Sequence, residues 1–310
     1  SDLVDTQTIE VPFDLAPSRK RYPFARHFEP VFHHVIKLGE PGERRIVGLE
    51  NESPRRCRIC HRHEPEVSFE TRSHIIPDAF GNRELFCADE CDECNHRAGQ
   101  GGGLEHDFIT YTAPWRALSA HPTRRGGLKL RVGKGAGFIE NAQKAGGRVR
   151  IHVADSGVKV GKYGDRSVLL DVLVEPYRPM NVCKALARMA LLSIDEHLLP
   201  EYEHVRRWVV GEVEHFPVLT TVQSPGPGDP YCGIWVYKRL QPLVGLCPMI
   251  VEFMFGSIRW FWHAPTLSLT LPRNRQLPHF FSTAYFPHIP TGYVKLIKTD
   301  KRVGGHHLPI

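Results

Sequence analysis

The pattern of hydrophobic and polar residues after residue 128 predicts a region that mixes strands with helices. Six short runs alternate in polarity or are rich in β-branched and aromatic residues, as strands are. These runs are Leu128–Val132, Val149–Val153, Ser167–Val174, Tyr231–Arg239, Met249–Phe255 and Ser257–His263. Only Gly256 separates the last two, which predicts a hairpin.

Two helices are expected between these groups of strands. Apolar residues recur at helical spacing across Met180–His197, directly after Pro179, which suits the first turn of a helix. A second helix is expected at Pro200–Val210 and should end at Gly211. The order of elements therefore predicts an α+β fold class for this region.

Two features of the same region allow either a functional or a purely structural interpretation. Lys184 and Arg188 lie one turn apart on the first helix and either contact a phosphate backbone or belong to a solvated face. The strand Arg259–His263 is rich in aromatic residues, which either stack on unpaired bases or fill a core. In both cases the structural interpretation is favoured.

Changes in composition divide the chain into three segments. Residues 1–55 form a proline-interrupted lead-in with a basic and aromatic patch at 19–27. Residues 56–115 hold the cysteine- and histidine-rich part. A connector of glycine, proline and arginine at 121–127 begins the α+β region, 121–310. We therefore expect a small module followed by a larger domain.

Composition and charge narrow the class of protein. With 310 residues, 41% apolar and 24% charged, the chain is long enough for two or three globular domains. We find no apolar run of about 18–20 residues and no signal peptide, so a cytoplasmic location is expected. The net charge is +6, and residues 1–134 hold 20 Lys+Arg and 20 Asp+Glu, whereas 135–310 hold 20 and 14. The C-terminal part is thus the one expected to favour a polyanionic partner.

Five of the eight cysteines lie within 57–94, and four of them form two Cys-x-x-Cys pairs. A Cys-x-x-Cys turn directs two thiolates at one ion, and two such turns complete a tetrahedral zinc site. The predicted zinc ligands are Cys57, Cys60, Cys91 and Cys94. Cys87 is the fifth, either a small packed residue on a strand or a substitute ligand.

The segment between the two cysteine pairs is predicted to contain a strand, a turn and a second strand. Val67, Phe69 and Thr71 alternate as in a strand, and His74 falls near its end. A turn at Gly81-Asn82 leads to a returning strand at Leu85–Cys87. A short helix, Asn95-His96-Arg97-Ala98, then follows the second pair and ends at Gly99.

Taken in order, the motifs Cys-x-x-Cys, Ser-His-Ile-Ile-Pro, Cys-x-x-Cys-Asn and a glycine run with Leu104-Glu105 resemble the HNH endonuclease family of the zinc-knuckle type. The resemblance covers about 57–108. It implies a zinc-stabilised ββα-metal fold, in which a hairpin and a helix hold one Mg²⁺ or Mn²⁺ over the scissile phosphate. The expected fold class is therefore α+β, with this HNH module preceding the larger α+β domain.

The resemblance also implies roles for single residues. His74 matches the general base that takes a proton from the attacking water, and Asn95 matches the asparagine that binds the catalytic metal. Glu105 is either a distal member of the cofactor-binding site or a residue of a helix face. Ser73 stands where many relatives carry a metal-binding acid or histidine, and a hydroxyl binds hard cations less well than a carboxylate.

The serine leaves three possibilities open. A carboxylate comes from elsewhere, with Glu105, Glu70 and Asp92 as candidates, or the metal affinity is low, or the site is inactive. The favoured hypothesis is a metal-dependent endonuclease that hydrolyses phosphodiester bonds, in DNA rather than RNA, in restriction or antiphage defence. The alternatives are a non-catalytic zinc module that binds nucleic acid and a nuclease gated by its C-terminal domain. That domain would bind a regulatory partner or form a homo-oligomer.

Overall fold

A computed structural model describes the regions of the protein that position the site. The described residues are 9–10, 27–40, 42–50, 53–118, 129–132, 137–142, 148–152, 169–173, 175–215, 218–223, 230–242, 247–264, 292–296 and 306–309. The connector predicted at 121–127 and nearly all of the basic patch at 19–27 lie outside these residues.

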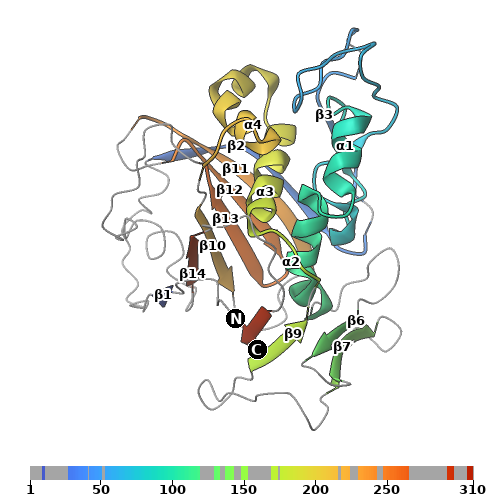
Figure 1. The fold of residues 1–310 in the computed structure, drawn as a ribbon, viewed down its shortest axis with the longest axis vertical. Helices are drawn as coiled ribbons and strands as arrows, with labels where there is room; N and C mark the ends of the chain where they lie inside the picture. The colour runs from blue at the N-terminus through green and yellow to red at the C-terminus, as the bar shows by residue number, and fades with distance from the viewer. Residues whose placement is uncertain are drawn as a thin grey trace.

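The largest element is an antiparallel sheet of seven strands (Figure 1). In spatial order its strands are β1 (Ile9–Glu10), β14 (Gly292–Leu296), β10 (Val218–Gln223), β13 (Ile258–His263), β12 (Met249–Phe255), β11 (Tyr231–Arg239) and β2 (Phe28–Lys37). The hairpin predicted between β12 and β13 is confirmed, with Gly256 at φ +59°. Strand β2 comes from the predicted lead-in 1–55 and pairs with β11 from the predicted domain 121–310, so these two segments share one sheet.

The helices α2 (Leu104–Leu118) and α3 (Pro179–Ser193) pack against each other, and α3 contacts β12 and β13 of this sheet (Figure 1). Trp260 and Trp262 of the aromatic strand are fully buried, so the core interpretation is confirmed and the base-stacking one is wrong. Helix α3 ends at Ser193, earlier than predicted. A 3-10 helix, Glu196–Tyr202, then accommodates Pro200 and leads into α4 (Glu203–Val210), which ends at Gly211 as predicted.

A second antiparallel sheet contains the remaining short strands of the C-terminal region. Its order is β15 (His306–Pro309), β9 (Leu169–Leu173), β6 (Lys129–Val132), β7 (Gly137–Ala142) and β8 (Arg148–His152). The strands predicted at 128–132, 149–153 and 167–174 are confirmed to within two residues at each end. The combination of these sheets with the helices confirms the predicted α+β class.

The cysteine-rich module is built on a sheet of three short strands, followed by a helix. The order is β3 (Arg45–Val47), β5 (Leu85–Cys87) and β4 (Ser73–His74), with a 3-10 turn at Asp78–Phe80 and α1 at Asp92–Gly99. Of the strand predicted from Val67 to His74, only Ser73–His74 forms, as β4, and residues 67–71 are not a strand. The Asp92 carboxylate accepts hydrogen bonds from the backbone N–H groups of Glu70 and Thr71, so these donors are not used in a ladder.

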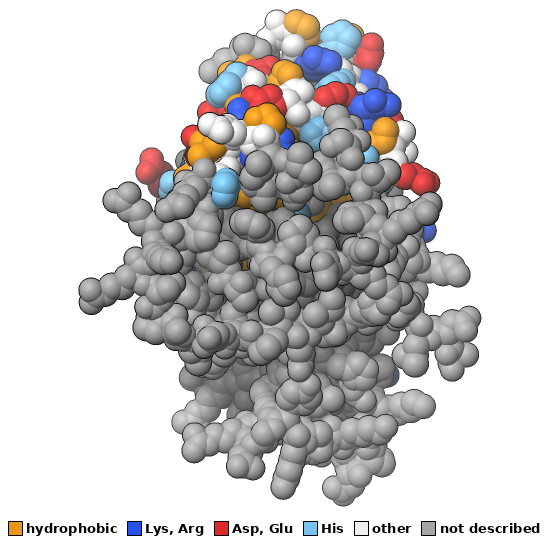
Figure 2. All heavy atoms as spheres, turned by 90° about the vertical axis from the view of Figure 1, so that its left-hand side faces the viewer, with side chains coloured by type: hydrophobic (Ala, Val, Ile, Leu, Met, Phe, Trp, Pro, Cys, Tyr) orange, Lys and Arg blue, Asp and Glu red, His pale blue; other side chains and the backbone are white. Residues whose placement is uncertain are grey.

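Helix α1 begins at Asp92, three residues before its predicted start. Its first turn carries Asp92 and Glu93, which favour the positive end of the helix dipole. In the part of the chain that the structure describes, no helix combines the length and apolar character that a membrane span requires. Figure 2 shows basic, acidic and histidine side chains intermixed over the coloured part of one face.

Candidate metal and nuclease site

The four cysteines predicted to bind zinc form one cluster. The Sγ atoms of Cys57, Cys60, Cys91 and Cys94 all lie within 4.8 Å of one another. The Sγ atoms of Cys60 and Cys91 are 3.7 Å apart. Four sulfurs bound tetrahedrally at a Zn–S distance of about 2.3 Å would be separated by about 3.8 Å. The cluster therefore has the ligands and the spacing to hold a structural zinc ion.

Backbone hydrogen bonds prepare Cys57 for this role. Its Sγ accepts from the N–H groups of Ile59 and Cys91, at 3.4 Å each, as thiolate ligands commonly do. Hydrogen bonds from the thiols of Cys91 and Cys94 lower the pKa of Cys57, and the same bonds raise the pKa of the two donors. The cluster thus concentrates negative charge on a sulfur that a cation would neutralise.

Cys87 is separate from this cluster. It lies on β5, is completely buried, and its burial raises the pKa of the thiol to about 12. Of its two predicted interpretations, the small packed residue is confirmed, because a neutral thiol on a core strand is not a metal ligand.

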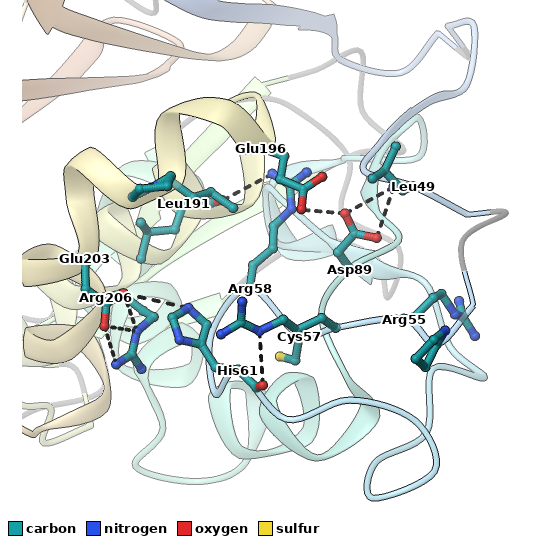
Figure 3. A pocket seen from close by; sticks show the side chains of 14 residues that line it. Leu49, Arg55, Cys57, Arg58, His61, Asp89, Leu191, Glu196, Glu203 and Arg206 are labelled. Carbon is teal, nitrogen blue, oxygen red and sulfur yellow. Dashed lines mark hydrogen bonds and ion pairs between the residues drawn. The ribbon is translucent and has the colours of Figure 1, made fainter.

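The first cysteine turn is docked on the C-terminal helices through two buried arginines. Arg58 donates to Asp89 and to the carbonyl oxygen of Ile194, at 2.6 Å, beyond the last turn of α3. Arg206 of α4 donates to the carbonyl oxygen of Ile59 at 3.0 Å. Figure 3 shows Arg58 extending between Asp89 and Leu191. These three residues line a cavity of about 380 Å³.

A second cluster, made of oxygen and nitrogen atoms, surrounds Ser73. The Ser73 hydroxyl donates to Glu90 and lies 3.2 Å from Oδ1 of Asn95. Arg188 of α3 donates to both carboxylate oxygens of Glu90, to Ser73 Oγ at 3.0 Å and to Glu105 at 3.4 Å. We call these five residues the oxygen centre. The structure thus brings Ser73, Asn95 and Glu105 of the predicted site together with Arg188 and with Glu90, which the sequence did not indicate.

Burial controls the charges of the oxygen centre. The side chains of Arg188 and Glu90 are 3% and 0% exposed. Burial by itself disfavours the charged guanidinium, but the charge and hydrogen bonds of Glu90, together with the charge of Glu105, outweigh it and raise the pKa of Arg188. Burial also raises the pKa of Glu105, since the opposing attraction of Arg188 is weaker than the desolvation. Arg188 therefore carries a permanent positive charge among these oxygen atoms.

The interpretations of α3 that the sequence favoured are wrong at one position. Arg188 belongs neither to a solvated face nor to a surface that meets a phosphate backbone, because it is buried and ion-paired. Lys184, one turn earlier, lies over the ring of Trp208 at 5.6 Å from its centroid. The polarity pattern could not show this, because the partner of Arg188 is 98 residues away in the sequence.

His74 lies on the other face of β4 from Ser73, since successive residues of a strand point to opposite faces. Its partner across the ladder is Phe86, and the two rings meet edge to face with centroids 4.7 Å apart. Phe86 also lines an open groove of about 620 Å³, together with Phe69 and three arginines. We call this the arginine groove and define it by Arg44, Arg55, Phe69, Arg72 and Phe86.

Asp92 and Glu70, two of the three carboxylates predicted to compensate for Ser73, make contacts outside the oxygen centre. Partial burial alone would raise the pKa of Asp92, but hydrogen bonds from Ser68, Thr71 and the backbone of Glu70 outweigh it and lower the pKa to about 2. Glu70 lies on the rim of the arginine groove. Glu90 is the carboxylate beside Ser73, and it stands in the sequence directly before Cys91 with no feature to distinguish it.

Comparison with known proteins finds a match to the cysteine-rich module. The family model for HNH endonuclease matches residues 57–102, which contain both cysteine pairs, Ser73, His74, Glu90 and Asn95. No curated protein and no solved structure matches the chain. The match supports a nuclease-type function for the module and implies that it binds nucleic acid. The matched segment ends before Glu105 and does not include Arg188.

Proposed function

We propose that the HNH module formed by residues 57–102 makes this protein a metal-dependent endonuclease that hydrolyses phosphodiester bonds in DNA. The observation that carries the proposal is the combination of the family match with a cysteine cage that joins the Cys57–Cys60 turn to the start of α1. This frame brings Ser73 within 3.2 Å of Asn95, the position at which the family holds its metal.

The chemistry of the donor atoms fits a hard divalent cation. Ser73, Glu90, Asn95 and Glu105 offer hydroxyl, amide and carboxylate oxygens, the ligands that Mg²⁺ and Mn²⁺ prefer. Such an ion, when bound, supplies positive charge to the developing phosphorane and to the leaving oxygen. Asn95 and Ser73 are the proposed ligands from the hairpin and the helix, and Glu105 is the proposed distal ligand.

His74 is the proposed general base. A neutral imidazole accepts a proton near pH 7, and Phe86 fixes the plane of the ring by its edge-to-face contact. Removal of a proton from water at this ring would generate the nucleophile, and cleavage would leave a 5′-phosphate and a 3′-hydroxyl. The base therefore acts from the face of β4 that carries Phe86.

The arginine groove is the proposed path of the DNA backbone. The guanidinium of Arg44 lies over the ring of Phe86 at 5.3 Å, and that of Arg55 lies over Phe69 at 4.7 Å. These contacts restrict the side chains before DNA arrives. Arg72 is half exposed and pairs with Glu50. Groups of this kind bind phosphates and position a duplex without reading its sequence.

Nicking of supercoiled plasmid in the presence of Mg²⁺ or Mn²⁺ tests the function. The wild type should cut, and His74→Ala should cut about 10²–10⁴-fold more slowly, which is the usual effect of removing a general base. His63→Ala is the matched control, because His63 is an exposed histidine of the same module and should cut normally. Equal rates for wild type and His74→Ala would place the base elsewhere.

A second function is favoured by one specific observation. Ser73 replaces the expected acid, and Arg188 already neutralises Glu90, as in a module that binds nucleic acid without cutting it. DNA binding by the wild type without cleavage under any metal would support this alternative. The proposed cellular role, restriction or antiphage defence, would be tested by plating phage on cells that express the wild type or His74→Ala.

A further inference from the structure

At position 73 the Ser-His motif lacks the metal-binding acid that the HNH resemblance leads us to expect. Ser73 stands where an acid is expected, and a hydroxyl is a weak ligand for a hard cation. The Ser73 hydroxyl nevertheless has a polar neighbour. It is buried and donates to the carboxylate of Glu90, 17 residues further along the chain.

Glu90 is placed to supply what the serine lacks. Serine is two carbons shorter in its functional reach than glutamate, and the longer side chain of Glu90 brings a carboxylate to the Ser73 hydroxyl, which itself lies 3.2 Å from Asn95. Of the carboxylates proposed from the sequence, Asp92 is held by the 68–71 loop and Glu105 reaches the centre only through Arg188. Glu90 is therefore the acid nearest to Ser73 among the described residues.

Arg188 controls the charge of that acid. Its guanidinium binds both oxygens of Glu90, and the same guanidinium donates to Ser73 and approaches Glu105. The pair is excluded from solvent, so water does not screen it. A divalent ion bound to Glu90 would lie close to this fixed positive charge and would be repelled by it.

We propose that Glu90 supplies the metal-binding carboxylate that position 73 lacks, and that Arg188 of α3 is its resident counterion, with which a divalent ion must compete. The inference rests on the proposed function only in taking the oxygen centre as the place of the metal. Arg188 is then a positioning residue from outside the matched segment, and it sets the metal affinity of the nuclease.

The experiment measures Mn²⁺ binding to the full-length, zinc-loaded protein. Free Mn²⁺ is followed by its electron paramagnetic resonance signal, and Mn²⁺ does not compete well with zinc for thiolates. Arg188→Gln leaves Glu90 without a counterion, so Mn²⁺ should bind at least about tenfold more tightly than to the wild type. Adding Mn²⁺ should also raise the melting temperature of this variant more than that of the wild type.

Two further variants identify Glu90 as the ligand. Glu90→Gln removes the charge and keeps the shape, and it should weaken Mn²⁺ binding below the wild-type level. The double variant Glu90→Gln with Arg188→Gln should lose the tighter binding of Arg188→Gln alone. Because Glu90→Gln removes the fully buried Glu90 carboxylate itself, this variant and the double variant test the proposal even where Arg188→Gln folds poorly. Arg207→Gln is the matched control, as an exposed arginine of α4 with the same change of charge.

The outcomes separate this inference from the proposed function. Unchanged or weaker Mn²⁺ binding in Arg188→Gln would overturn the competition, and unchanged binding in Glu90→Gln would remove Glu90 as a ligand. Neither result depends on cleavage. A protein that cuts no DNA but shows both expected changes in Mn²⁺ binding would retain the inference while losing the nuclease. A protein that cuts DNA but shows neither change in Mn²⁺ binding would retain the proposed nuclease function and overturn the inference.

Discussion

The cysteine cage and the oxygen centre lie in the same small module, yet they are assembled in different ways. All four thiols of the cage come from 57–94, and two of their backbone partners lie in the same segment. The oxygen centre takes its cation from Arg188, on a helix outside the module. The cage is therefore complete within a local segment, whereas the oxygen centre requires the C-terminal region.

The difference shows that a nuclease motif can be local in sequence and still depend on distant parts of the fold. The first cysteine turn depends on the C-terminal helices in the same way. Arg58 donates to the carbonyl oxygen of Ile194, and Arg206 donates to that of Ile59. The module is thus held against α3 and α4 by buried polar contacts on two sides. Perturbing the cage and the oxygen centre separately should reveal different kinds of damage.

The largest effect should follow from breaking the cage. Cys94→Ser removes one zinc ligand, and structural zinc contributes about 10–16 kcal/mol to the folding of small zinc modules. The variant should lose zinc, measured by elemental analysis, and the module should unfold. Cys87→Ser is the control, since Cys87 is also buried but lies outside the cage, and it should keep one zinc per chain. Full zinc content in Cys94→Ser would show that the ligand set is wrong.

A smaller but still large loss should follow from breaking the oxygen centre. Arg188→Met leaves the buried Glu90 carboxylate without its partner, which typically costs about 3–5 kcal/mol. Denaturant unfolding should show this loss, while zinc content should stay unchanged. The paired replacement Glu90→Gln with Arg188→Met should recover much of the stability, because the fully buried Glu90 charge is then removed together with its partner. If the single and double variants were equally unstable, Arg188 would act through packing and not through charge.

Arginines of the groove should change DNA affinity without changing stability. Arg44→Ala combined with Arg72→Ala should weaken binding and lower the slope of log affinity against log salt by about 2, since each phosphate contact on duplex DNA contributes about 0.9. Titration of labelled duplex at several salt concentrations measures the slope. Arg83→Ala with Arg207→Ala, which removes the same charge away from the groove, should leave the slope nearly unchanged.

The smallest effect should come from the loop that Asp92 organises. The pKa of Asp92 is lowered from its ordinary value of 3.8 to about 2, so its contribution to stability is present above about pH 4 and is lost as the pH falls toward 2. Asp92→Asn should cost on the order of 1 kcal/mol at pH 7, because solvent screens this partly exposed group. The difference from wild type should shrink in melts at low pH, and a constant difference would contradict the assignment.

The parts of the site that the sequence predicted are those fixed by short spacings. Two Cys-x-x-Cys pairs and the Ser-His and Cys-Asn motifs indicate the cage, β4, β5 and α1, and the structure contains all of these. The strand expected at 67–71 failed because a side chain, Asp92, takes the backbone donors that a ladder would need. Alternation of polarity carries no information about that competition.

The remaining parts were hidden because their partners are far apart in the sequence. Arg188 lies on an amphipathic helix, where an arginine normally marks the solvated face, and only its contact with Glu90 identifies it as buried. Strand β2 was assigned to a lead-in because its residues have no neighbour in sequence with which to pair. Its partner, β11, lies about 200 residues further along the chain.

The long separation between Glu90 and Arg188 also has a consequence for synthesis of the protein. The two residues are 98 positions apart, so at about 5–20 residues per second the ribosome needs some 5–20 seconds to add Arg188 after Glu90. During that interval the nascent module can bind zinc, but its carboxylate has no guanidinium to meet. The newly made module therefore holds the Glu90 carboxylate without its counterion until α3 is synthesised.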